Sequence, residues 1–97
     1  MNIGVCRVRL RLAENHSLKG KRQVLRTIKA RCRHKFDIAI AETGDQDVWQ
    51  TATLGIICIS NDRRHANEIL SNTVNFIDAG YFDAELLDYN IEIISVF

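Results

Sequence analysis

The chain has 97 residues, of which 46% are hydrophobic and 26% charged, with no proline and a formal net charge of +1. This length and composition predict one globular domain over residues 1–97 that buries a core without metal or disulfides. No apolar run approaches the ~18 residues of a membrane span, and arginines stand at 7, 9 and 11, where a signal peptide would be apolar. We therefore expect a cytoplasmic protein that does not engage a membrane.

Apolar periodicity divides the first half of the chain into a strand, a helix and a second strand. Residues 2–12 alternate, with Cys6, Val8, Leu10 and Leu12 on one face and three arginines on the other, which predicts a half-buried strand. The stretch "AENHS" (13–17) turns the chain, and Ser17 is the expected N-cap of a helix that continues to about His34. Apolar residues at 36, 38 and 40 predict a second strand.

The second half repeats this order. "TGDQD" (43–47) predicts a hairpin connection into a strand over 49–60, and "SND" (60–62) predicts the start of a helix that stops at Gly80. The expected inward face of the final strand is Leu87, Tyr89, Ile91 and Ile93. The β-α-β-β-α-β order is typical of the ferredoxin-like α+β fold. That fold has a four-stranded antiparallel sheet in the order 4-1-3-2, two helices on one face and the other face open.

Charge is distributed very unevenly. Residues 1–36 hold eleven Lys or Arg and one acid, whereas residues 37–97 hold two Lys or Arg and eleven acids. On the first helix, five cations fall within an arc of about 80° beside the apolar face; we call this set, Lys19, Arg22, Arg26, Lys29 and Arg33, the basic stripe. Neighbouring like charges repel, and no acid interleaves, so the stripe favours a polyanionic partner. The alternative is that acids from the second half neutralise it. Lys21, Arg31 and Lys35 lie elsewhere on the helix and are expected to extend over the core edge.

Three arginines of the first strand, Arg7, Arg9 and Arg11, form a second basic feature, the arginine ladder, on the open sheet face. The expected strand order places Asp88, Asn90 and Glu92 across from it, so cross-strand pairing is a complete explanation of the ladder. Nucleic-acid contact is the other interpretation. The open-face positions of the third strand carry no aromatic side chain, so any RNA binding would follow the backbone rather than stack bases.

Other polar residues give weaker indications. Arg63 and Arg64 follow the Asp62 cap and suit a phosphate at a helix N-terminus as well as simple capping. Glu42, Asp45 and Asp47 surround the hairpin, where carboxylates suit a cation or a turn, and Trp49 anchors the hairpin or marks an interface. The spacing of Cys6, Cys32 and Cys58 predicts buried thiols and no metal site.

Four segments together, "HSLKGKR", "DQDVWQTATLGI", "SNDRRHAN" and "LLDYNIEI", resemble the YlxP-like family of small uncharacterised bacterial proteins. The resemblance implies a ferredoxin-like fold and, since such genes often lie beside those for translation initiation and ribosome maturation, a role near RNA or the ribosome. One departure is Gly20, where the family usually has the Glu that completes a capping box with Ser17.

Three hypotheses follow. The first is a non-catalytic RNA- or ribosome-associated accessory factor, with no cofactor, that binds phosphates through the basic stripe with support from Arg63 and Arg64. The second is a protein-interaction module that forms a homodimer through the open sheet face or the edge strand at 36–41. The third, a small enzyme that uses Asp62, His65 or the hairpin carboxylates, has the least support, because no nucleophile, base and orienting group fall together in the sequence.

Overall fold

The computed structural model describes residues 1–12, 16–80 and 82–97. Six elements follow in the predicted order: β1 (Asn2–Arg11), α1 (Leu18–Lys35), β2 (Ala39–Gly44), β3 (Thr51–Ser60), α2 (Arg63–Ala79) and β4 (Glu85–Ser95). Much of the predicted turn "AENHS", including Glu14, lies outside the described residues.

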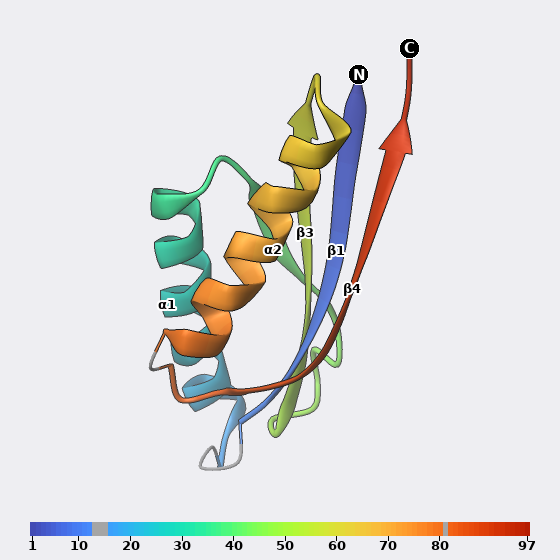
Figure 1. Cartoon of the computed structure of the whole chain (residues 1–97). Coiled ribbons are helices and arrows are strands. Elements are labelled where there is room, and N and C mark those ends of the chain that lie inside the picture. Colours follow the sequence, from blue (N-terminus) through green and yellow to red (C-terminus); the bar gives the residue numbers. More distant parts are fainter. Residues whose placement is uncertain (13–15, 81) are drawn as a thin grey trace.

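The four strands form one antiparallel sheet in the order β2-β3-β1-β4, which confirms the predicted ferredoxin-like arrangement. Both helices lie on one side of the sheet (Figure 1). The other side is the open face, and β2 and β4 are the two sheet edges. The first and last residues lie at the same end of the sheet, where Val96 N–H donates to Met1 O.

Both helices begin where the sequence predicts. Ser17 accepts a hydrogen bond from Gly20 N–H, and Asp62 accepts one from Arg64 N–H, so each side chain satisfies one of the free amides of a first turn. The first helix extends to Lys35, and Phe36 is its C-cap. The second strand therefore begins at Ala39 and not at residue 36.

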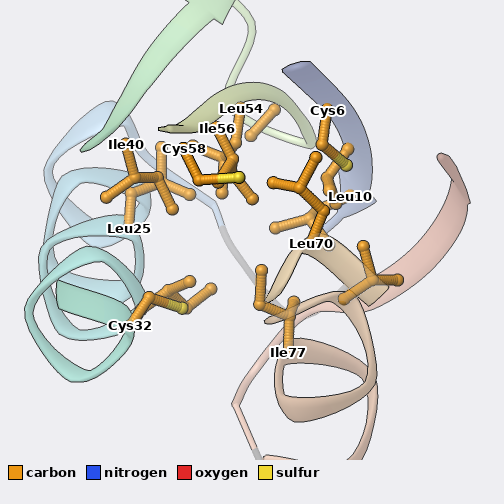
Figure 2. Packing of buried hydrophobic residues seen from close by; sticks show 14 of the residues in the cluster. Cys6, Leu10, Leu25, Cys32, Ile40, Leu54, Ile56, Cys58, Leu70 and Ile77 are labelled. Atoms are coloured by element: carbon orange, nitrogen blue, oxygen red, sulfur yellow. The ribbon is translucent and has the colours of Figure 1, made fainter. Parts of the chain in front are cut away.

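The core lies between the helices and the sheet (Figure 2) and takes side chains from all six elements. The three cysteines are buried in it as free thiols. Burial raises the pKa of Cys6 and of Cys32 to about 11, and burial also raises the pKa of Cys58. These thiols stay protonated at neutral pH and pack as small apolar side chains, as predicted.

The inward face of β4 was predicted incorrectly at one end. A bulge between Arg9 and Leu10 of β1 pairs Arg9 with Asp88 and Leu10 with Leu86. Leu87 is the extra residue and is 40% exposed, while Leu86 packs against the core in its place. Beyond the bulge, Ile91 and Ile93 pack against the core as predicted, but Tyr89, on the edge strand, stays half-exposed.

Candidate nucleic-acid interface

The basic stripe runs along one flank of α1. Lys19, Arg22, Arg26 and Arg33 are exposed and Lys29 is half-buried, so all five reach the surface. Three ion pairs are formed within the described residues, Arg9–Asp88, Arg11–Glu85 and Lys21–Glu42, and none of them involves the stripe. In the described part of the chain, carboxylates of the acidic half therefore form no direct ion pair with these cations.

The stripe faces the β2 edge of the sheet. Arg33 shows the direction, because its Nη2 donates to the backbone O of Ile40 in β2 at 2.8 Å. The other four cations share its arc of the helix, so they line the same side of the molecule. One guanidinium nitrogen of Arg33 is thus committed to the fold. The arginine retains further N–H donors for a ligand, since a guanidinium carries five.

The opposite flank of α1 also carries cations, but these pack on aromatic rings. Lys35 Nζ lies 4.7 Å from the ring centroid of Phe76, and the Arg31 guanidinium carbon lies 5.5 Å from that of Phe82. Phe76 meets Phe82 edge-to-face. The prediction that Arg31 and Lys35 extend over the core edge is consistent with these contacts, which account for both side chains without an outside partner.

The arginine ladder is paired within the sheet. Arg7 Nη2 donates to Asn90 Oδ1 at 2.8 Å, Arg9 Nη1 lies 2.9 Å from Asp88 Oδ2, and Arg11 pairs with Glu85. Cross-strand pairing therefore explains all three arginines. The expected partner Glu92 was wrong: Glu92 lies opposite Val5, and the bulge brings Glu85 opposite Arg11.

The structure does not bring Arg63 and Arg64 to the stripe. Together with Asp62 and Asn67, both line a shallow hollow beside Ile93 of β4. Since β4 and β2 are opposite edges of the sheet, the two basic surfaces lie on different sides of the molecule. A single phosphate backbone cannot touch both without crossing the helical layer.

Lys21 was predicted to extend over the core edge, and this was wrong, because Lys21 is 1% exposed. Its ammonium donates to the backbone O of Val48 at 2.6 Å and to the backbone O of Asp45. Glu42 Oε2 lies 2.9 Å from the same nitrogen but makes no hydrogen bond in the structure, so the attraction between them is mainly electrostatic. This contact holds the hairpin between β2 and β3 onto the first turn of α1.

The hairpin carboxylates do not converge. Glu42 faces Lys21, while Asp45 Oδ2 accepts from Thr51 Oγ1 at 3.2 Å. Among the described residues, no three His, Cys, Asp or Glu side chains come together to hold a metal ion. Trp49 is 39% exposed beside this hairpin.

His65 belongs to a different part of the molecule from the hairpin. Its Nδ1 lies 3.3 Å from Ser60 Oγ, and the same oxygen accepts a hydrogen bond from Asp62 N–H. Glu42 pairs with Leu54, six residues before Ser60 on β3, so about 20 Å separates these positions. The hairpin carboxylates therefore do not share a site with Asp62 and His65.

Two signals in the sequence identify the Lys21–Glu42 contact in retrospect. Lys21 lies four residues before Leu25 and seven before Ile28, which places it in the middle of the apolar face of the helix. Glu42 has the same parity as the buried Ile40, so it points toward the helices. A cation and an acid at core-facing positions of neighbouring elements predict a buried ion pair.

In the described ranges, neither helix combines the length and the apolar character that crossing a membrane would need.

A family model described as a protein of unknown function (DUF503) matches residues 3–91. The chain is also 41% identical, over 63 residues, to "Uncharacterized protein YlxP" of Bacillus subtilis (strain 168), a match that covers 65% of this chain and 68% of the relative. Because the family model spans most of the chain, this protein belongs to the DUF503, or YlxP-like, family of unknown function.

Proposed function

We propose that this protein is a non-catalytic accessory factor of ribosome assembly or translation that acts in the cytoplasm and binds the phosphate backbone of RNA along α1. The observation that supports this proposal most directly is the basic stripe: five cations on one flank of a helix, without an ion-pair partner among the described residues. Each pair of neighbouring like charges costs a few tenths of a kcal/mol in an isolated helix. A polyanion would offset that cost when it binds.

The shape of the stripe favours contact with the backbone over reading of bases. Its members follow one another every three or four residues, so the Cβ atoms of neighbouring members are about 5–6 Å apart along the helix. The stripe itself contains no aromatic side chain on which a base would stack. We therefore expect affinity that depends strongly on salt and weakly on sequence.

Arg63 and Arg64 form a separate, secondary contact in this proposal. They lie on the β4 side, at the N-terminus of α2, where backbone amides and guanidinium groups both favour a phosphate. We expect them to matter only for an RNA large enough to reach around the helical layer. A short single strand should bind the stripe alone.

A salt titration tests the proposal. Fluorescence anisotropy would measure binding of a labelled single-stranded fragment of ribosomal RNA over a range of KCl concentrations. With four or five phosphate contacts, the slope of log affinity against log salt should be about −3 to −3.5 for a single strand. A flat response, or no binding at low salt, would contradict the proposal.

A matched pair of variants separates the stripe from general positive charge. Arg26→Glu and Arg31→Glu make the same change of charge on the same helix, but on opposite flanks. Arg26→Glu should weaken RNA binding about fivefold or more, because a phosphate contact is lost and a repulsion is added. Arg31→Glu should have a clearly smaller effect. Equal losses would show that only net charge matters and would exclude a specific interface.

A further inference from the structure

The open face of the sheet has two halves of different character. The half near the end of β1 carries the arginine ladder and its partners on β4. The half near the start of β1 carries five branched aliphatic side chains on three neighbouring strands; we call these residues, Ile3, Val5, Ile57, Ile59 and Ile94, the apolar patch. The pairing register makes the patch continuous, because Ile3 lies directly between Ile59 and Ile94, and Val5 lies beside Ile57.

Most of these aliphatic side chains are exposed, although a sheet face that only contacts water would normally carry polar residues. Val5, Ile57, Ile59 and Ile94 keep between 37% and 67% of their surface accessible. An antiparallel sheet with one face in water normally presents polar residues there, as the ladder half does. Single exposed aliphatic residues are common, but a contiguous group on adjacent strands usually marks a surface that is covered by a partner.

The border of the patch indicates what kind of partner covers it. Arg7 and Glu92 lie on the two strands at this border, next to Val5 in the register. Arg7 donates to the neutral amide of Asn90, and Glu92 takes part in none of the ion pairs of the described residues. The border thus presents one cation and one anion that are neighbours on the face but form no ion pair with each other.

We propose that the apolar patch binds a second copy of this chain in a twofold homodimer. In a twofold interface the same surface meets itself, so Arg7 of each copy reaches Glu92 of the other while the aliphatic side chains pack between the sheets. A partner of single charge would satisfy only one of the two border residues. This inference is independent of RNA binding, because the helices lie on the other side of the sheet.

The dimer would leave both basic stripes free and directed outward. Two stripes on one particle would bind one long RNA with an affinity greater than that of either stripe alone, provided that the RNA spans both. RNA binding and dimerisation remain separable, however, because a short RNA occupies one stripe and does not depend on the second copy.

Sedimentation equilibrium of the tag-free chain over a wide concentration range tests the dimer. The mass should rise from the 11.1 kDa of one chain toward twice that value. Ile59→Glu places a charge in the patch and should raise the dissociation constant about tenfold or more, since burying an unpaired charge is costly. Thr53→Glu is the matched control on the same strand and face but outside the patch, and it should dimerise like the parent chain. A parent chain that stays monomeric throughout, or a dimer that persists in Ile59→Glu, would overturn the proposal.

Exchanging the charges at positions 7 and 92 tests the proposed Arg7–Glu92 pairing directly. Because the expected result is a gain of association on mixing, an unfolded variant cannot mimic it. Arg7→Glu alone and Glu92→Arg alone should each dimerise more weakly than the parent chain, because like charges then meet at the border. Mixed in equal amounts, the two variants should form a heterodimer in which each Glu meets an Arg. If the mixture associates no better than its separate components, the Arg7–Glu92 arrangement is wrong.

Discussion

The arginine ladder on β1 and the basic stripe on α1 are built from the same kind of residue at regular spacing, yet the fold treats them differently. Each ladder arginine meets an acceptor on β4, at a position set by the strand register. The stripe cations face the β2 edge, where Arg33 bonds a backbone carbonyl and none of the five forms an ion pair within the described residues. Positive charge in a sequence therefore indicates a ligand only after the internal partners are known.

Lys21 extends the comparison to a cation that the fold has buried. Lys21→Met should lower the free energy of unfolding by about 3 kcal/mol, because Glu42 loses its only ion-pair partner in the described structure and the carbonyls of Asp45 and Val48 lose a donor. Urea denaturation followed by Trp49 fluorescence would measure this loss. Lys21→Met combined with Glu42→Leu should recover most of it. A single variant as stable as the parent would show that the buried pair contributes nothing.

Gly20 lies in the first turn of α1, which contains no acidic residue, and an acid at this position should strengthen the helix. Gly20→Glu should raise the free energy of unfolding by about 1 kcal/mol from helix propensity, with a further gain from a capping bond to Ser17 N–H. Gly20→Ala supplies the propensity gain alone, so the difference between the two variants measures the capping bond. Thermal unfolding at constant salt is sufficient. A Glu variant no better than the Ala variant would show that the capping box does not form.

The ladder should contribute modestly to stability, since its ion pairs are exposed. A double-mutant cycle of Arg9→Gln and Asp88→Asn should give a coupling energy of about 0.2–1 kcal/mol, which falls as salt is added. Chemical denaturation at low and high salt would measure the coupling. A value near zero at low salt would mean that the ladder is no better compensated than the stripe.

Removing one cation from the stripe should change the free energy of unfolding in the opposite direction to removing one from the ladder. Arg26→Gln removes one cation from a row of like charges, so it should raise the free energy of unfolding by a few tenths of a kcal/mol at low salt. Added salt should erase the gain by screening the repulsion. Arg9→Gln under identical conditions is the control and should be destabilising. A destabilised Arg26→Gln would reveal an internal partner and weaken the proposed RNA interface.

The order of elements and both helix caps were predictable from the sequence because each follows from a local pattern, and the sheet topology then follows from that order with right-handed crossovers. Alternation marks strands, and Ser17 and Asp62 supply side-chain acceptors at helix starts. The bulge near Leu87 was not predictable, since one extra residue reverses the parity of a strand without a signal of its own. Glu85 was missed as a partner of the ladder for the same reason.

The candidate interface was predictable in composition but only partly in position. Helical spacing alone places five cations on one flank of α1. The packing of α1 on the sheet decides which flank of the helix faces β2. The packing of α2 decides that Arg63 and Arg64 lie near β4. The burial of Lys21 was missed because lysine is seldom fully buried, although its position among Leu25 and Ile28 indicated it.

The hydrogen bond from Val96 N–H to Met1 O holds both ends of the chain at the end of the sheet that carries the apolar patch. An affinity tag or fluorescent fusion attached at either end therefore starts beside Ile3 and Ile94, on the surface where a second molecule would sit. Such additions would compete with self-association and leave the helical side undisturbed. If RNA binds the basic stripe and the chain dimerises through the apolar patch, pull-down experiments with fused protein would recover RNA while under-reporting the dimer.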